Sequence, residues 1–211
     1  MPTAILKKYN LKQMNITANE TFHIFNQGNN QETLFYEVED YREFLKFFKK
    51  FVFPHAKILA YCLMPNHFHF LIHATEDSTK IKRVGNIDLC ALSNGFRLLQ
   101  SNYAQYINKK HNRSGSLFRQ KTKAKSMLDG DEYYEFIAFQ YIHQNPLKAG
   151  LVTRMENWEY SSFSDYCDPG KESFCDRELA YKLIGFDKEN FIKEAYKTIG
   201  ENSIKKYADG F

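Results

Sequence analysis

The sequence of 211 residues predicts an α+β fold, in which an antiparallel sheet is covered by helices on one side. Short apolar and aromatic runs of strand length alternate with longer segments of helical spacing, and two of the short runs are separated by only two turn residues. The expected order is strand, helix, strand, strand, helix, strand, helix. That order is the split β-α-β arrangement of ferredoxin-like folds.

Strand signals come from apolar, aromatic and β-branched runs bounded by turn residues. Gly28-Asn29-Asn30 is a strong loop signal after the first run, and Pro65-Asn66 predicts a tight turn between the second and third. The expected strands are Thr21–Gln27, Lys57–Met64, His67–His73 and, as a basic strand or extended segment, Phe118–Lys125.

Helix signals come from apolar residues three or four positions apart. Asp40 with Glu43 offers a cap for the first helix, and Asp129 or Asp131 offers one for the third. Pro146 is expected to end the third helix, because the residue before a proline disfavours helical geometry. The expected helices are Glu39–Phe51, Ile87–Lys110 after a polar link at 74–82, Glu132–Gln144, and two helical pieces near Arg177–Gly185 and Lys188–Gly200.

The composition favours one packed domain in a reducing compartment. Hydrophobic residues make up 43% and aromatic residues 16%, which argues against disorder. The four cysteines show no C-x-x-C pairing, so a zinc cluster or disulfide framework is unsupported and the cytoplasm is expected. No signal-peptide core and no apolar run of ~20 residues is present. We expect a lead-in at 1–19, one main domain at 20–166 and a small helical extension at 167–211.

The net charge of +4 and the pI near 8.7 are mildly basic, but the basic residues are clustered. Such clusters fit a polyanionic partner, although a solvated surface is the ordinary explanation for any one of them. Basic residues that bracket the loop before the third helix are candidates to follow nucleic-acid phosphates while aromatic residues stack unpaired bases. These candidates are Lys109, Lys110, Arg113, Arg119, Lys121, Lys123 and Lys125.

Two histidines share one face of the third expected strand. Because successive side chains of a strand point to opposite faces, His67 and His69 lie together and Phe68 and Phe70 lie behind them. Two imidazoles so placed can reach one divalent ion. A His-x-His pair in a strand is also a common accident, so the spacing alone leaves both interpretations open.

Tyr141 and Asn145 are four residues apart on the third helix and therefore lie one above the other. A tyrosine hydroxyl, with a free pKa of about 10, needs an ion or a base to become a nucleophile. The Asn145 amide oxygen could complete the ligand set of an ion held by the histidines, and a nucleophile beside a metal suits attack on a phosphodiester. The alternatives are that Tyr141 packs in the core and that Asn145 caps the helix before Pro146.

Several segments in the same order and spacing resemble the single-tyrosine HUH transposases, in the branch of REP-associated tyrosine transposases. MPNHFHFLI resembles the motif of two histidines around a bulky hydrophobic residue, and YIHQNPLKAGLV resembles the segment with the catalytic tyrosine. FNQGNNQETLF looks like the family's Gly-Asn-Asn turn, SGSLFRQKTKAK like its glycine-plus-basic segment, and WEYSSFSDY like its post-core segment. The resemblance covers residues 20–166.

The resemblance implies the ferredoxin-like HUH fold and an enzyme that cleaves and rejoins single-stranded DNA at hairpin-flanked sites through a 5′-phosphotyrosine, in transposition or mobilisation of repeats. His67 and His69 match the metal-binding histidines, Tyr141 matches the nucleophile and Asn145 matches the polar third ligand. The implied ion is Mg²⁺ or Mn²⁺, and the implied partner is DNA with imperfect hairpins. A homodimer, in which the tyrosine helix serves the partner's site, and a monomer both remain open.

Two positions depart from the resemblance. Thr122 stands where many relatives have an aromatic residue, and Lys148 stands where many have arginine. Lysine keeps the charge but loses bidentate phosphate geometry. Two other functional classes also remain open: a hairpin-binding protein with this fold and no turnover, and a metal-dependent hydrolase that uses water and forms no covalent intermediate.

Overall fold

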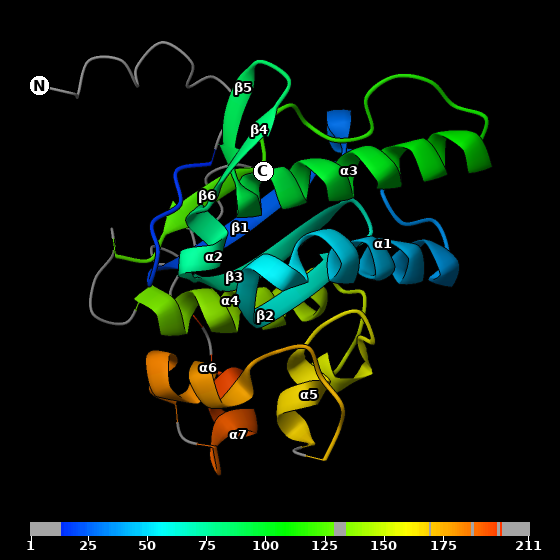
Figure 1. Ribbon diagram of the computed structural model, residues 1–211. Helices are drawn as coiled ribbons and strands as arrows, with labels where there is room; N and C mark the ends of the chain where they lie inside the picture. The colour runs from blue at the N-terminus through cyan, green and yellow to red at the C-terminus, as the bar shows by residue number, and fades with distance from the viewer. Residues whose placement is uncertain (1–13, 129–133, 169, 187, 198, 200–211) are drawn as a thin grey trace, which may run out of the picture.

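A four-stranded antiparallel sheet with the strand order β2-β3-β1-β6 forms the centre of the protein (Figure 1). Its hydrogen-bonded pairs, β2 with β3, β3 with β1 and β1 with β6, are all antiparallel. This order is that of the split β-α-β arrangement, so the predicted α+β, ferredoxin-like fold class is confirmed. The strands are β1 (Thr21–Gln27), β2 (Ala56–Met64), β3 (His67–Ala74) and β6 (Lys123–Ser126).

The computed structural model describes residues 14–128, 134–168, 170–186, 188–197 and 199. The expected cap at Asp129 or Asp131 and most of the expected lead-in lie outside these residues. The longer helices are α1 (Val38–Phe51), α3 (Ala91–Lys110) and α4 (Tyr134–Lys148). The shorter ones are α2 (Glu76–Thr79), α5 (Phe163–Cys167), α6 (Arg177–Ile184) and α7 (Phe191–Ala195), with single 3-10 turns at η2 (Asn29–Gln31), η3 (Phe53–His55) and η4 (Met155–Asn157).

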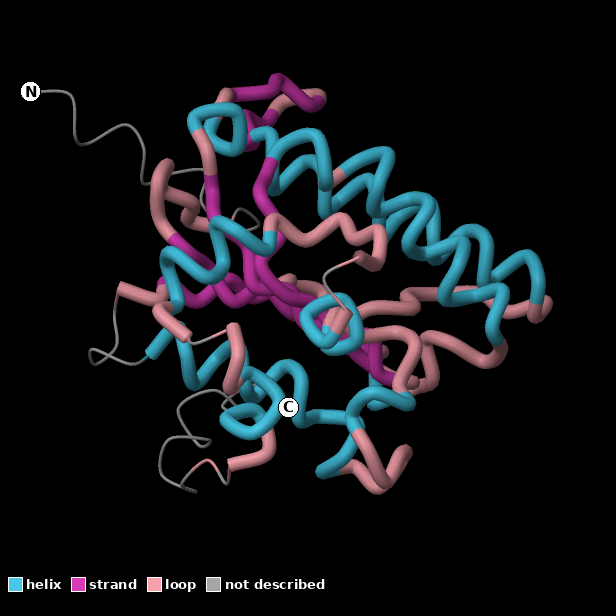
Figure 2. Tube along the Cα trace, turned by 90° about the horizontal axis from the view of Figure 1, so that it is seen from below, coloured by secondary structure: helices cyan, strands magenta, loops and turns pink. Residues whose placement is uncertain are grey.

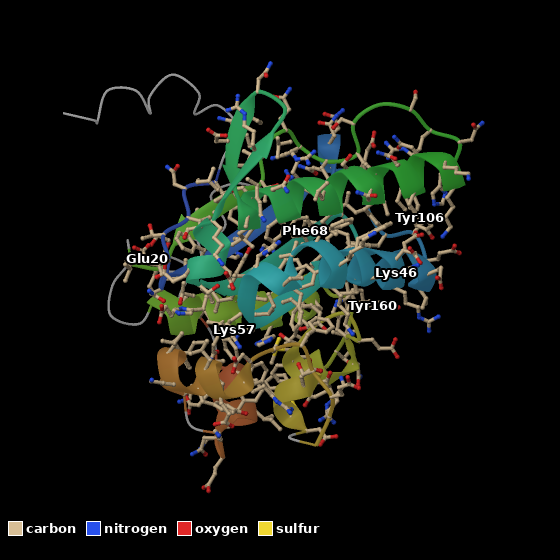
Figure 3. All side chains as sticks on the ribbon, in the orientation of Figure 1. Glu20, Lys46, Lys57, Phe68, Tyr106 and Tyr160 are labelled. Atoms are coloured by element: carbon tan, nitrogen blue, oxygen red, sulfur yellow. The ribbon has the colours of Figure 1, made fainter. Side chains whose placement is uncertain are left out.

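Helices cover both faces of the sheet, as Figure 2 shows from below. Phe68, labelled in Figure 3, contacts Phe44 of α1 and Phe96 of α3, with ring centroids 5.4 Å and 6.2 Å away. On the opposite face, His69 contacts Tyr141 of α4, with ring centroids 5.5 Å apart. The expectation of helices on one side holds for α1 and α3 and is wrong for α4. Most side chains on both faces of β3 are buried, so each face has a cover.

Aromatic stacking and one close backbone approach hold α1 and α3 on the sheet. The ring of Phe48 in α1 stacks on that of Phe70 in β3 at 4.3 Å, and both side chains are fully buried. Where the two helices meet, a Cβ at Gly95 would lie 2.3 Å from the carbonyl oxygen of Phe51. Glycine therefore allows the helices to approach to this distance.

The start of α1 is stabilised by a capping box. The Asp40 carboxylate accepts hydrogen bonds from the backbone N–H groups of Tyr36 and Glu37, at 2.8 Å and 3.2 Å. Asp40 therefore caps the helix as predicted, but its partner in the box is Glu37. Glu43 instead accepts a hydrogen bond from Lys46.

A small β-hairpin occupies the region expected to hold a polar link and the start of a helix. Strand β4 (Ile81–Val84) pairs with β5 (Ile87–Cys90), and α3 begins only at Ala91. Gly85 supplies a positive φ of 58° in the two-residue turn between β-branched residues. The prediction of a helix from Ile87 is wrong because four residues of apolar spacing do not distinguish a strand from a first helical turn.

Helix α4 continues through Pro146 to Lys148, so the expectation that Pro146 ends it is wrong. A proline removes one hydrogen bond to the carbonyl four residues earlier, and here that loss falls in the last turn. The Asn145 side-chain amide donates to the Tyr141 carbonyl at 2.9 Å. Beyond the proline, the N–H of Ala149 donates to the Asn145 carbonyl at 2.9 Å, which continues the helical pattern.

The C-terminal part of the chain closes the β2 edge of the sheet and covers α4. The N–H of Leu63 donates to the carbonyl oxygen of Tyr160 at 2.8 Å, and the N–H of Asp176 donates to the carbonyl oxygen of Ile58 at 2.8 Å. Helix α6 has the predicted extent and ends at Gly185, which has a φ of 72°, whereas α7 is shorter than the predicted piece at 188–200. Among the described helices, none combines the length and the apolar character that crossing a membrane requires.

Candidate functional site

Two adjacent strands bring three histidines to the sheet face that α4 covers. On β3, His67 and His69 point to this face, and on β1 Phe25 lies directly opposite His69. His23 lies two residues before Phe25 and therefore shares its face, diagonally across from His69. The His67 and His69 rings lie edge to face with centroids 4.9 Å apart, close enough for both to reach one ion.

A hydrogen-bond acceptor fixes the orientation of His67. Its Nδ1 lies 2.6 Å from the Asn66 side-chain oxygen, in the turn between β2 and β3. Since an amide oxygen only accepts, the hydrogen of His67 is on Nδ1 and the lone pair is on Nε2. The Nδ1 of His69 lies 2.9 Å from the Nε2 of His23, so in His69 too the ring nitrogen left for an ion is Nε2.

Burial keeps these imidazoles uncharged at neutral pH. Desolvation lowers the pKa of His67 from 6.5 to about 4 and that of His23 to about 3. The pKa of His69 is held well below 6.5, first by burial and then by its two histidine neighbours. A metal ligand must present a neutral imidazole, so the electrostatics of this face suit metal binding.

Tyr141 lies on α4, the helix that covers the histidine face, and its ring packs against the histidines. Its ring lies edge-on to His69, with centroids 5.5 Å apart, and 6.2 Å from the ring of His23. Burial raises the pKa of Tyr141, a hydrogen bond with the Asn145 side chain lowers it, and Cys62 raises it further. The hydroxyl is therefore protonated at neutral pH unless another group favours the phenolate.

Helix α4 is held in this position by contacts on its outer side. The Gln144 amide donates to the carbonyl oxygens of Ala195 and Lys197, at 2.7 Å and 2.9 Å. The Nε2 of His143 lies 2.8 Å from the Ser162 hydroxyl. Ser162 and residues of the C-terminal extension thus fix the helix that carries Tyr141 against the sheet.

All four residues proposed for chemistry, His67, His69, Tyr141 and Asn145, lie in one neighbourhood of a single chain. Sequence reasoning missed His23. The alternation in Thr21–Gln27 places His23 and Phe25 on one face, but only the pairing of β1 with β3 brings that face to the histidine pair.

The donor set fits a weakly held catalytic ion more closely than a structural one. Among the described residues, no three or more His, Cys, Asp or Glu side chains converge as a metal site. The candidate ligands are two imidazoles and the amide of Asn145, which would leave several coordination positions for water or substrate. Imidazole nitrogen binds transition-metal ions more readily than Mg²⁺, so Mn²⁺ matches this set better.

Two of the basic residues predicted to contact nucleic acid are engaged in ion pairs. Lys110 lies 2.5 Å from carboxylate oxygens of both Asp40 and Glu37, and Arg113 forms an ion pair with Glu32. These pairs lie on the side of the sheet that α1 and α3 cover, away from the histidines. They hold α3 and the following loop to the segment before α1.

Two other basic residues lie beside the candidate site, on the edge strand β6. Lys123 pairs with Phe25 and Lys125 pairs with His23, so both side chains share the histidine face. Their ammonium groups lie 5.8 Å and 6.0 Å from the centroid of the Phe25 ring. The remaining candidates lie outside this strand: Lys109 and Lys121 are exposed, and Arg119 is half-buried.

One cavity of the described residues lies away from the histidines. It has a volume of about 480 Å³ and sits where β2 begins, whereas His67 pairs with the last residue of β2. Its walls include Phe53, Pro54, Lys57, Phe174 and Asp176.

Comparison with known proteins gives one informative similarity. No family model matches the chain, and no curated protein matches it. The fold is similar to the solved structure of a REP-associated tyrosine transposase bound to a REP hairpin, with a TM-score of 0.52 and 13% sequence identity. The match covers 76% of this chain and 86% of the transposase chain. At this identity the similarity is one of fold: over three quarters of its length, the chain folds like a REP-associated tyrosine transposase.

Proposed function

We propose that the protein is a metal-dependent enzyme that cleaves and rejoins single-stranded DNA at hairpin-flanked sites, with Tyr141 as nucleophile. The observation that carries the proposal is the approach of Tyr141 to His69, at 5.5 Å between ring centroids, from a helix on the opposite side of the site. The fold similarity to a transposase bound to a hairpin supports the same substrate class.

In the proposed cleavage step, the Tyr141 oxygen attacks the scissile phosphorus. A bond forms between the tyrosine oxygen and phosphorus, and the bond to the 3′ oxygen breaks. The tyrosine proton is lost to solvent, and the departing 3′ oxygen takes up a proton to become a hydroxyl. The products are a 5′-phosphotyrosine and a free 3′-hydroxyl, and attack by another 3′-hydroxyl reverses the step without an external energy source.

His67, His69 and Asn145 would hold the divalent ion, Mn²⁺ or Mg²⁺. When bound, the ion would polarise a nonbridging phosphate oxygen and favour the tyrosine phenolate. The chain itself contributes neutral imidazoles, the Asn145 hydrogen bond that lowers the pKa of Tyr141, and a covered face that restricts water.

Lys123 and Lys125 are the basic residues best placed to hold the DNA backbone during this reaction. They lie on the histidine face, and their ammonium groups are above the Phe25 ring. The other candidates, Lys109, Lys110, Arg113, Arg119 and Lys121, would act further from the scissile phosphate. A homodimer is compatible with this arrangement but is not required by it, because both histidines and the tyrosine come from one chain.

The test is incubation of the full chain with labelled single-stranded hairpin DNA from the region flanking its gene, followed by a denaturing gel. With Mn²⁺ or Mg²⁺ we expect a covalent protein–DNA band that is lost with chelator. Tyr141→Phe should abolish the band, whereas Tyr134→Phe, two turns away on the same helix, should retain it.

The alternatives predict different gels. Cleavage without a covalent band, unaffected by Tyr141→Phe, would replace the proposal with a hydrolase that uses water. Tight hairpin binding with neither cleavage nor a band, across several flanking hairpins, would replace it with a binding protein that has no turnover.

A further inference from the structure

His23 is a buried histidine for which packing gives no reason. Its side chain is fully buried, beside Phe25 at 4.8 Å and Tyr141 at 6.2 Å between ring centroids. An apolar ring would fill this space without the cost of burying two polar nitrogens. Within the described part of the chain, the Nδ1 of His23 has no hydrogen-bond partner.

Among the described residues, His23 makes its polar contact with a proposed metal ligand. Its Nε2 lies 2.9 Å from the Nδ1 of His69, and both side chains are fully buried, an environment that favours neutral rings. Between two neutral imidazoles, one nitrogen must donate and the other accept. If His23 donated, the hydrogen of His69 would sit on Nε2, and His69 could not bind an ion there. If His23 accepts, His69 presents the Nε2 lone pair.

The neighbouring ligand favours the second arrangement. The Nδ1 of His67 donates to the Asn66 oxygen at 2.6 Å, which leaves the lone pair of His67 on Nε2. An accepting His23 would give His69 the same tautomer, so that both ligands present the same nitrogen. Acceptors that bond the other ring nitrogen of a metal-binding histidine orient its ring and raise its basicity.

We propose that His23 is a positioning residue, which accepts a hydrogen bond from the Nδ1 of His69 and so holds the His69 Nε2 lone pair available for the divalent ion. The inference rests on the proposed function, because it assigns His69 to the metal. It adds a residue from a different strand, β1, to a site otherwise built from β3 and α4.

The test uses the full chain with two substitutions of matched purpose. His23→Phe keeps a ring of similar shape but removes the acceptor, whereas His23→Gln restores an oxygen that can accept. Mn²⁺ binding is measured by titration calorimetry. We expect His23→Phe to weaken binding by about 10–100-fold, as loss of the acceptor that orients a metal-binding histidine does. His23→Gln should recover most of the affinity.

His73→Phe is the matched control, because His73 lies on β3 beyond the site and is only half-buried. It should bind Mn²⁺ like the wild-type protein, and circular dichroism should show all variants folded. Unchanged affinity in His23→Phe would overturn the inference. Equal losses in His23→Phe and His23→Gln would overturn it too, because packing and not the hydrogen bond would then be responsible.

A second readout needs no metal. Long-range ¹H–¹⁵N correlation spectra of the metal-free protein report which nitrogen of His69 carries the hydrogen. We expect Nδ1–H in the wild-type protein and a mixture of tautomers in His23→Phe. Nε2–H in the wild-type protein would overturn the positioning role. If the wild-type protein bound Mn²⁺ no better than a His67→Ala, His69→Ala variant, the proposed function would lose its ion, while the tautomer would still decide the role of His23.

Discussion

Lowering the pH from 7 to 5 should destabilise the protein strongly, because buried histidines gain protons only when the chain unfolds. His23 and His143 are buried, and desolvation lowers the pKa of each from 6.5 to about 3. In the unfolded chain each titrates near 6.5. Between these values the unfolded state binds more protons, so stability is present above pH 6.5 and is lost as the pH falls toward 3.

The magnitude follows from the two pKa values. At pH 5 each of these histidines binds almost one proton in the unfolded chain and almost none in the folded protein. Integrated from pH 7 to pH 5, each lowers the free energy of unfolding by about 2 kcal/mol, or about 4 kcal/mol for the pair. His67, with a pKa of about 4, and His69 act in the same direction. The lowered pKa of Asp40 has its effect only below 3.8, outside this range.

Urea denaturation at pH 7, 6 and 5, followed by circular dichroism, measures this loss. His143→Phe separates one histidine from the rest, because its ring packs among aromatic residues and Ser162 keeps its hydrogen bonds with the backbone of Tyr61. The difference in unfolding free energy between pH 7 and pH 5 should shrink by about 2 kcal/mol in this variant. Equal stability of the wild-type protein at both pH values would refute the reasoning.

Three further predictions concern DNA binding and packing. Replacing Lys123 and Lys125 by glutamine should weaken hairpin binding and reduce the slope of log K against log salt by about 1.4, measured by fluorescence anisotropy, since each phosphate contact on a single strand contributes about 0.7. An unchanged slope would remove both from the DNA surface. Phe48→Ala should lower the free energy of unfolding by about 3–5 kcal/mol through the cavity it leaves. Gly95→Ala should destabilise by about 1–3 kcal/mol, because the carbonyl of Phe51 would have to move. Denaturation midpoints at the wild-type value would contradict either packing prediction.

Sequence periodicity predicted β1, β2 and β3 because each of these strands has a strong local signal. The fourth, expected as a strand or extended segment over Phe118–Lys125, is a strand only at Lys123–Ser126. Thr21–Gln27 has the predicted bounds, and the β2–β3 hairpin differs by one residue at each outer end. The β4–β5 hairpin was missed, since four-residue strands carry too few positions to distinguish a period of 2 from one of 3.6. Helix α4 continues through Pro146 because the hydrogen bond that the proline cannot make falls in the last turn, where its loss costs little, and the rule that a proline ends a helix does not take this position into account.

The candidate site could be predicted in its parts but not in its contacts. Strand parity places His67 and His69 together, and helical spacing places Tyr141 and Asn145 together, from sequence alone. The choice of sheet face for α4 and the approach of His23 both depend on pairing between distant segments. Partners such as Glu32 for Arg113 lie 81 residues apart, so a sequence of basic residues does not reveal which charges are already neutralised.

During synthesis, strand β2 leaves the ribosome long before the segment that closes its edge. Tyr61 and Ser162, which share a hydrogen bond, are 101 residues apart. At about 5–20 residues per second, that separation corresponds to roughly 5–20 seconds of elongation. For that time a strand of nine residues, nearly all of them buried in the finished protein, has one edge open to strands of other chains. Premature termination between β6 and Tyr160 would make this exposure permanent, so such fragments should aggregate even though every strand of the central sheet is present.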